Sequence, residues 1–406
     1  MDYRGIILIC GVLALLACAS CAIEYFRRHS SGIDAATLST CRSRVNAWWL
    51  MFGSLICALL LGTGVTVFFF AVISFWALRE YVTITPTRPS DHKPLVVVFF
   101  LLTPLQFILV GSNPAWFRSV FGRDSYFFFS ALIPSCVFLL LPAVVAMTND
   151  TKRYLERIAK LQVGLLICVY SLSFAPALLT METVKTTGSA SACEQQEIPA
   201  LGIGKQVDKV LTARENPVAT FHNSTLEEIA SIERSQSDLV TAPEDEDVVA
   251  DAPIPSDKKE VSQVRSSDEK YASSNVTLLF FFVFLTQVSD VAQYFWSLTF
   301  RKHVIAPAVN SSKTYEGLAL GALTTVLVAI CLRYFTPFGS WIESAFAGLV
   351  VACMGFAGNI TLSAMKRDQG MGDFEHLIDG HNGVLDRIDS LCFAAPVFYH
   401  YVKLCC

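Results

Sequence analysis

Charged residues are scarce in this sequence. Only 16% of its 406 residues are Asp, Glu, Lys or Arg, whereas 53% are hydrophobic. A soluble globular chain carries about 25% charged residues, so this chain has too little polar surface for a soluble protein of its size. It also lacks a basic patch with interleaved aromatic residues, and its pI is near 6.0. These features exclude nucleic acid as a partner.

Paired cysteine elements are missing as well. The 13 Cys include no pair of C-x-x-C elements, which a zinc site of the finger type would need. Most of them lie inside apolar runs, where cysteine behaves as a small hydrophobic residue. These are Cys10, Cys18, Cys57, Cys136, Cys168, Cys331, Cys353 and Cys392. The cysteines therefore indicate neither a zinc site nor a disulfide framework.

Long apolar runs are what the sequence has in abundance. A bilayer's hydrocarbon core is about 30 Å thick, so a helix of roughly 20 apolar residues crosses it. The runs predict spans over roughly 5–23, 48–62, 64–80, 94–111, 126–147, 161–181, 276–298, 317–335, 341–362 and 390–404. The segment 62–64 (Gly-Thr-Gly) leaves the second and third spans either as a tight hairpin or as one long bent helix. The predicted fold is an all-α polytopic membrane protein, a bundle of about ten transmembrane helices.

Positive charges indicate the orientation of these spans. Arg27 and Arg28 follow the first apolar run instead of preceding it, which favours an uncleaved anchor over a signal peptide. Lys and Arg gather in the loops after the first, third and fifth spans, and such loops lie in the cytoplasm. The same alternation places the loops at 299–316 and 363–389 on the cytoplasmic side.

Three parts follow from this pattern. Residues 1–182 form an N-terminal transmembrane part of about six helices, and residues 276–406 form a C-terminal transmembrane part. Between them, residues 183–275 are polar, with an acidic run at 243–247 and several Pro. Because this composition cannot bury a compact core, we expect a disordered, non-cytoplasmic insert.

Two clusters in the C-terminal part contain the candidate chemistry. The first includes Asp290, which lies inside an apolar span, where a carboxylate is costly unless it faces a polar cavity or a partner. Asp290 is therefore a functional candidate, or alternatively the partner of Arg301 or Lys302 in an ion pair.

The second cluster surrounds Asp386 and Asp389, which share one face of a helix that begins near residue 384. Paired carboxylates beside Lys and Arg suit a divalent metal with a triphosphate. A salt-bridge network with Arg387 is the structural alternative, and spacing alone does not choose between them.

The second cluster resembles the C-terminal signature of phosphatidate cytidylyltransferases, also called CDP-diacylglycerol synthases. That signature reads approximately S-x-x-K-R-x-x-x-x-K-D, a short apolar spacer, and then G-H-G-G-x-x-D-R-x-D-S. The matching residues are Ser363, Lys366, Arg367, Asp373, Gly380, His381, Gly383, Asp386, Arg387, Asp389 and Ser390. The first cluster is similar to the D-x-x-x-Y, A-P and S-P-x-K-T-x-E-G elements of the same family. Its matching residues are Asp290, Tyr294, Ala306, Pro307, Lys313, Thr314, Glu316 and Gly317.

The resemblance implies a C-terminal catalytic part that converts phosphatidate and CTP to CDP-diacylglycerol and pyrophosphate in phospholipid biosynthesis. It implies Mg²⁺ as cofactor, held chiefly by Asp386, with Asn359 at a weakened second position. The implied catalytic residues are Lys313, Lys366, Arg367, Asp373, His381 and Asp389. The implied cofactor-binding and substrate-binding residues are Asp290, Tyr294, Thr314, Ser363 and Arg387.

The implied partners are CTP, phosphatidate and the lipid bilayer, and a homodimer is compatible with the resemblance. Because residues 77–80 (Ala-Leu-Arg-Glu) look like a bacterial branch of the family, we expect a multi-pass protein of the bacterial inner (plasma) membrane. The active site would then face the cytoplasm.

Four positions depart from the family pattern: Asn310, Asn359, Gly372 and Asn382. At Asn359 the family has an Asp that is implied to bind metal, and an amide keeps one oxygen but loses the charge. These departures favour one rival, a catalytically silent membrane scaffold. A second rival is a CTP-dependent enzyme acting on a polyprenol or polyprenyl phosphate, because the motifs imply a nucleotide and a metal but do not specify the lipid. A transporter is disfavoured because no internal repeat or pair of broken helices is visible.

Overall fold

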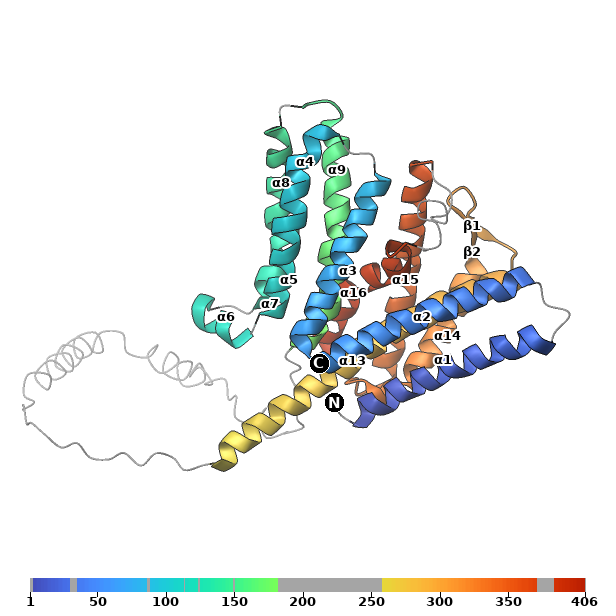
Figure 1. Ribbon diagram of the computed structural model, residues 1–406. Helices are drawn as coiled ribbons and strands as arrows, with labels where there is room; N and C mark the ends of the chain where they lie inside the picture. Colours follow the sequence, from blue (N-terminus) through green and yellow to red (C-terminus); the bar gives the residue numbers. More distant parts are fainter. Residues whose placement is uncertain are drawn as a thin grey trace, which may run out of the picture. The chain divides into compact units, whose positions relative to one another are not determined.

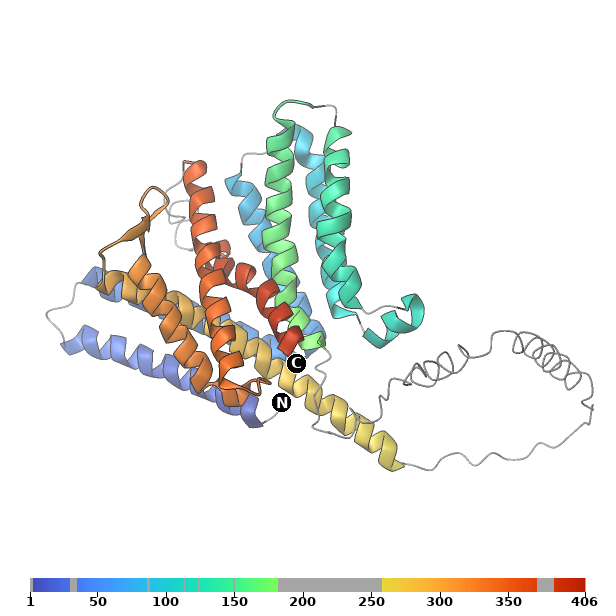
Figure 2. The same ribbon diagram turned by 180° about the vertical axis from the view of Figure 1, so that it is seen from behind.

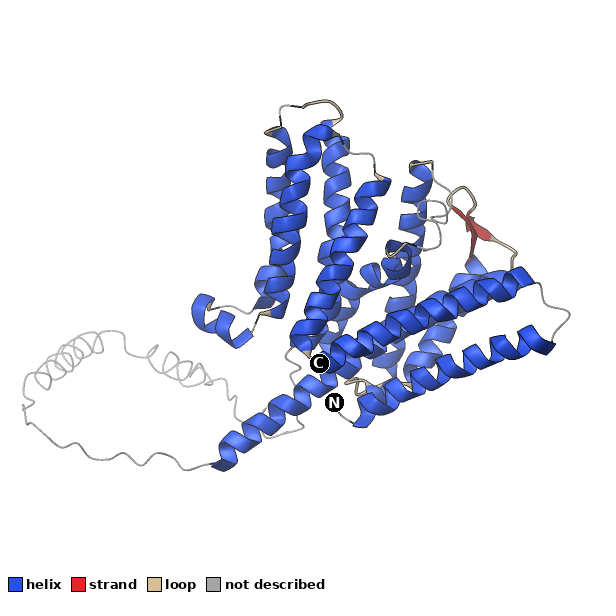
Figure 3. Ribbon diagram, in the orientation of Figure 1, coloured by secondary structure: helices blue, strands red, loops and turns tan. Residues whose placement is uncertain are grey.

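The computed structural model describes residues 3–29, 35–85, 88–112, 114–122, 125–148, 150–181, 258–370 and 383–405. Nearly all of these residues are helical (Figure 3). The single sheet among them is a two-stranded hairpin. The all-α prediction is confirmed for this part of the chain.

The N-terminal part is a series of helices interrupted at several points. It comprises α1 (Tyr3–His29), α2 (Ala35–Leu61), α3 (Thr63–Ile84), η1 (Pro89–Asp91), α4 (His92–Val97), η2 (Val98–Leu102), α5 (Thr103–Gly111), α6 (Pro114–Phe121), α7 (Ser125–Ala131), η3 (Leu132–Val137), α8 (Phe138–Ala146), α9 (Tyr154–Leu165), η4 (Leu166–Ser171), α10 (Leu172–Ala177) and η5 (Leu178–Thr180). Gly62 separates α2 from α3 at a φ of 114°, a conformation that glycine adopts readily. The second and third spans are therefore distinct helices that meet at one glycine.

The C-terminal part contains the hairpin and four longer helices. It comprises α13 (Lys258–Thr299), β1 (Val304–Ala306), β2 (Asn310–Thr314), α14 (Tyr315–Cys331), η6 (Arg333–Phe335), α15 (Trp341–Asp368) and α16 (Leu385–Cys405). The strands are antiparallel, with Val304 opposite Thr314 and Ala306 opposite Asn310. They occupy the loop expected at 299–316, where the sequence predicted no strand.

The C-terminal end of the predicted insert overlaps a helix of the structure. The insert was expected to be disordered up to residue 275, but the backbone is already helical from Lys258, where α13 begins. Residues 183–257 lie outside the described residues, so the prediction of disorder there is untested.

Seven helical stretches among the described residues are long and apolar enough to cross a membrane. They are Tyr3–His29, Thr63–Ile84, Pro89–Gly111, Ser125–Ala146, Tyr154–Thr180, Asn275–Thr299 and Trp341–Asp368. Val45–Leu61 and Tyr315–Cys331 are apolar but shorter, and the last predicted span coincides with α16. The chain is an integral, multi-pass membrane protein.

The C-terminal helix α16 joins the two parts. It packs against α15 on one side and against α3, η4 and α10 of the N-terminal part on the other (Figures 1 and 2). The ring of Phe398 on α16 stacks on that of Phe282 on α13, with centroids 4.7 Å apart. Both rings are fully buried, so α16 is fixed in position by the core.

Candidate active site

Three helices bring polar side chains of both predicted clusters into one network. Oγ of Ser390 on α16 donates to Oδ1 of Asp290 on α13 at 2.6 Å. Nδ2 of Asn359 on α15 donates to the same Ser390 oxygen at 2.6 Å and lies 3.2 Å from Oδ1 of Asp290. A carboxylate inside a span needs such partners. The Asp290–Asn359–Ser390 network therefore provides the polar surroundings that the sequence predicted for Asp290.

Glycines of α15 let the network form. A Cβ at Gly358 would lie 2.6 Å from the carbonyl oxygen of Asp389, and one at Gly355 would lie 3.3 Å from Cβ of Ser390. Small residues permit helices in membranes to approach closely. The backbones of α15 and α16 consequently come close enough for Asn359 to reach Ser390. The buried Asp389 carboxylate accepts the backbone N–H of Ser390 at 2.7 Å.

An ion pair joins the ends of the same two helices. Lys366 in the last turn of α15 pairs with Asp386 in the first turn of α16, and both side chains are partly buried. The partial positive charge of a helix N-terminus favours a carboxylate there. Asp389 interacts electrostatically with both Asp386 and Asp290, so the ion pair and the network belong to one site.

The hairpin contributes a further group of polar side chains. Nδ2 of Asn310 donates to Oγ of Ser363 on α15 at 3.1 Å, and Nε of Arg367 lies 3.4 Å from the carbonyl oxygen of Val309. Lys313 is buried, with its ammonium 6.0 Å from the ring centroid of Phe356, and it interacts electrostatically with Asp389. The hairpin thus brings a second lysine to the carboxylates.

The remaining predicted residues have varied positions. Thr314 is buried and caps α14, because its Oγ1 accepts the N–H of Gly317 at 3.0 Å. Arg387 is partly buried beside Asp386, and Tyr294 is 38% exposed. Asp373 and His381 lie outside the described residues, as do the substituted positions Gly372 and Asn382.

Sequence analysis missed two residues of this site. Ser390 matched the signature but received no role, although it is the centre of the hydrogen-bond network. Glu80 of α3 accepts the backbone N–H of Leu385 at 3.0 Å, and it comes from the N-terminal part. An ionisable side chain near the end of an apolar span was the signal that could have drawn attention to Glu80.

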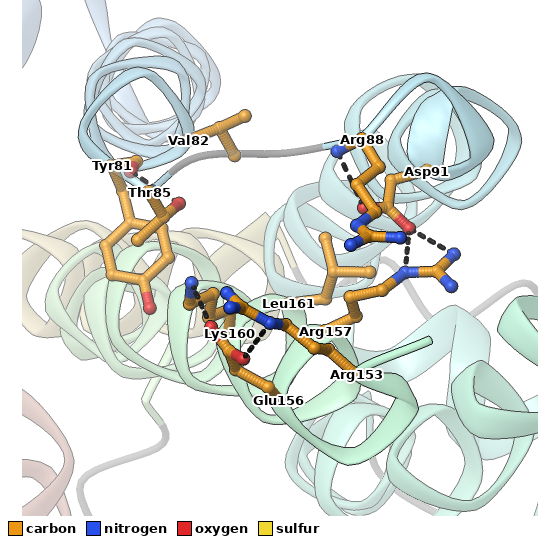
Figure 4. A pocket seen from close by; sticks show the side chains of 10 residues that line it. All are labelled: Tyr81, Val82, Thr85, Arg88, Asp91, Arg153, Glu156, Arg157, Lys160 and Leu161. Atoms are coloured by element: carbon orange, nitrogen blue, oxygen red, sulfur yellow. Dashed lines mark hydrogen bonds and ion pairs between the residues drawn. The ribbon is translucent and has the colours of Figure 1, made fainter. Parts of the chain in front are cut away.

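A polar pocket lies in the N-terminal part, beginning next to Glu80 at Tyr81 (Figure 4). It is a cavity of about 150 Å³ lined by Tyr81, Val82, Thr85, Arg88, Asp91, Arg153, Glu156, Arg157, Lys160 and Leu161. Arg157 and Asp91 are both buried, with Nε and Oδ1 2.6 Å apart, and Lys160 pairs with Glu156 at 2.8 Å. Arg153, Arg157 and Lys160 are thus paired with carboxylates in the wall of the pocket.

Further ion pairs, made by Asp150, connect the loops around this pocket. Arg88 and Arg157 each lie 3.5 Å from the Asp150 carboxylate. A hydrogen bond from the Ser90 hydroxyl, aided by the Lys152 backbone N–H and these arginines, lowers the pKa of Asp150. These interactions connect the segment before α4 with the start of α9. We therefore assign the pocket a structural role.

The donor atoms of the candidate site fit a hard divalent cation. Asp386, Asn359 and Ser390 supply carboxylate, amide and hydroxyl oxygens, which Mg²⁺ prefers. Among the described residues, no three His, Cys, Asp or Glu side chains converge into a metal cluster. Mg²⁺ at nucleotide sites is commonly bound by one or two carboxylates together with substrate phosphates. The described side chains are therefore compatible with a metal that is completed by its nucleotide.

The fold and site define a class of protein, a multi-pass membrane protein with carboxylates and lysines gathered where three helices and a hairpin meet. Such a mixture can bind a metal with a polyphosphate and offset developing negative charge. Residues 42–405 match the cytidylyltransferase family, and the chain belongs to that family.

Three relatives illustrate the extent of the similarity. The chain is 26% identical to the uncharacterized protein YnbB of Escherichia coli over 367 residues, 89% of this chain and 87% of that protein. It is 36% identical to a phosphatidate cytidylyltransferase of Haemophilus influenzae over 30% of this chain and 45% of the relative. It is 38% identical to one of Synechocystis sp. over 24% of this chain and 33% of the relative. The match to these two enzymes spans less than half of their length.

Proposed function

We propose that this protein is a CTP:phosphatidate cytidylyltransferase that makes CDP-diacylglycerol and pyrophosphate. The observation that supports this most is the meeting of the Lys366–Asp386 ion pair with the Asp290–Asn359–Ser390 network. Asp290, Lys366, Asp386 and Ser390 match the motifs that resemble the enzyme family, and Asn359 occupies a position where the family has Asp. Two relatives that match about a quarter to a third of this chain bear the name phosphatidate cytidylyltransferase.

The chemistry requires positioning and charge stabilisation. An oxygen of the lipid phosphate attacks the α-phosphorus of CTP, the bond between the α-phosphorus and the bridging oxygen breaks, and pyrophosphate leaves. The attacking phosphate is already ionised at neutral pH, so it needs no strong base. Lys313, Lys366 and Arg367 would hold phosphates and offset the charge of the leaving group.

Mg²⁺ would supply charge neutralisation at the nucleotide phosphates. Asp386 would be its principal protein ligand, with Asn359 as a second oxygen donor. Asp290 and Asp389 would shape the pocket, because both carboxylates are already engaged by Ser390. The positive-inside pattern supports a site on the cytoplasmic side of the membrane.

The test is CTP-dependent and Mg²⁺-dependent formation of CDP-diacylglycerol by purified protein in detergent–phosphatidate micelles. We expect product from the wild type and a loss of about 10²–10³-fold or more in Asp386→Ala, as for removal of a group that stabilises transition-state charge. Asp368→Ala is the matched control, because Asp368 is exposed at the end of α15 and contacts Gln369. Absence of both product and CTP binding in the wild type would overturn the proposal.

The departures from the family pattern leave a second candidate function, that of a catalytically silent membrane scaffold. The observation that favours it is that the amides of Asn310 and Asn359 are both engaged in hydrogen bonds within the protein. Equal CTP binding by the wild type and Asp386→Ala, without turnover in either, would favour this candidate. Product formed from a polyprenol or polyprenyl phosphate but not from phosphatidate would identify a different lipid substrate.

A further inference from the structure

A carboxylate of the N-terminal part touches the beginning of the catalytic helix. Glu80 lies on α3, and its Oε2 accepts the backbone N–H of Leu385 at 3.0 Å across a separation of 305 residues. Leu385 is the first residue of α16, and Asp386 follows it. A carboxylate that accepts a free N–H at a helix N-terminus stabilises that first turn by hydrogen bonding and by its charge.

The Glu80 carboxylate also lies close to the backbone at Gly383, just before α16. A Cβ added at Gly383 would overlap Oε1 of Glu80. The backbone at Gly383 therefore lies against the carboxylate, and a side chain at this position would require Glu80 to move. Glu80 and Gly383 form a complementary pair that places the start of α16.

The position of Glu80 is itself fixed by packing. The next residue, Tyr81, is buried, and a Cβ at Gly164 of α9 would collide with its ring. α3 is thus packed closely against α9 at this level. Glu80 also interacts electrostatically with both Lys366 and Asp386, so it borders the ion pair that the proposed mechanism uses.

We propose that Glu80 is a positioning residue, which holds the first turn of α16 so that Asp386 and Arg387 are correctly placed relative to Lys366. The expected effect of this role on catalysis rests on the proposed function. The contact with Leu385 stands independently of that function. In this arrangement the N-terminal part completes the geometry of the C-terminal site.

The first experiment measures the Mg²⁺ concentration for half-maximal CDP-diacylglycerol synthesis at fixed CTP. We expect Glu80→Ala to raise it about tenfold and to lower kcat, because misplaced Asp386 weakens metal–nucleotide binding. Glu80→Gln keeps an acceptor oxygen and should restore most of the loss.

Glu343→Ala is the matched control. Glu343 accepts the N–H groups of Gly339 and Ser340 at the N-terminus of α15, so its loss removes a comparable cap elsewhere in the chain. Glu343→Ala should reduce thermal stability without changing the Mg²⁺ dependence. If Glu80→Ala behaves in the same way, the positioning role is refuted.

A double-mutant cycle tests the steric pairing. Gly383→Ala alone should displace the flexible Glu80 carboxylate from Leu385 and impair activity, but no more strongly than Glu80→Ala. It should add little in the Glu80→Ala background, because the colliding carboxylate is gone, and such non-additivity is the signature of direct contact. Additive losses would contradict the pairing.

A measurement that does not depend on enzyme turnover tests the positioning role separately from the proposed function. Hydrogen exchange followed by mass spectrometry reports the protection of backbone amides at 384–388. If the wild type is inactive, faster exchange there in Glu80→Ala but not in Glu343→Ala still supports the positioning role. Unchanged exchange refutes it.

Discussion

At the scale of single residues, Asn359 determines how the site is held together without a metal. Its amide donates to Asp290 and Ser390, so it satisfies a carboxylate that is otherwise expensive inside a span. An aspartate at 359 could not donate and would face Asp290 as a like charge. Compared with the aspartate that the family resemblance implies at this position, we expect Asn359 to bind metal more weakly and to hold the network together through its own hydrogen bonds.

Asn359→Asp should make the stability of the protein depend on Mg²⁺. Without the ion, we expect a loss of about 1–3 kcal/mol, because a partly buried carboxylate loses its donor and gains a repulsive neighbour. Added Mg²⁺ should recover this loss and should be half-saturating at a lower concentration than in the wild type. Thermal unfolding in detergent with and without Mg²⁺ measures both effects.

Asn359→Ala is the control, since it removes the same hydrogen bonds without adding a charge. This variant should be less stable than the wild type, and its unfolding temperature should not respond to Mg²⁺. An Asn359→Asp protein whose unfolding temperature does not respond to Mg²⁺ would show that position 359 does not contact the metal.

At the scale of elements, the approach of α15 to α16 is what assembles the site. The two helices carry Asn359, Lys366, Asp386 and Ser390, and their backbones come together at Gly358. The capping box at Ser340 and Glu343 fixes the other end of α15. Side chains that are separated in sequence therefore meet because two helices share a seam of small residues.

Gly358→Ala should separate these helices. Its Cβ would lie 2.6 Å from the carbonyl oxygen of Asp389, so the backbone must shift at a cost of about 1–3 kcal/mol. We expect a lower unfolding temperature together with reduced synthesis of CDP-diacylglycerol. Gly53→Ala, where a Cβ meets nothing within 4 Å, should be neutral or slightly stabilising. Equal behaviour of the two variants would argue against a tight seam at Gly358.

At the scale of the whole molecule, the distribution of Lys and Arg predicts which side of the membrane the site faces. The positive-inside rule places the loops around residues 152, 302 and 366 in the cytoplasm and residues 183–257 outside it. The substrate CTP is expected on the same side as the site. Topology is therefore a condition for the proposed function.

Reporter fusions test this arrangement directly. A fluorescent protein fused after Lys152 or Lys302 should fluoresce, because it folds in the cytoplasm, and alkaline phosphatase at these points should be inactive. Alkaline phosphatase fused after Ser224 should be active, because that segment is expected outside. The opposite pattern would place the carboxylates on the wrong side for cytoplasmic CTP.

The sequence by itself determined the membrane-spanning class and the residue types of the site. Hydropathy over about 20 residues is a local property, so the spans could be located without knowledge of packing. Asp290 was identifiable because a carboxylate inside an apolar span is costly without a polar partner. Lys366 and Asp386 were identified from the spacing of the second cluster and from its resemblance to the cytidylyltransferase signature. The hairpin at 304–314 was not predicted, because its two short strands have no strong local pattern.

Only the tertiary structure decided which groups meet. The partners of Asp290 are on α15 and α16, and the partner of Glu80 is 305 residues away in the chain. Neither pairing follows from spacing, because contacts between distant segments depend on how helices pack and on where glycines let backbones approach. Local chemistry is encoded in the order of residues, whereas the position of each charge relative to the others exists only after the helices have packed.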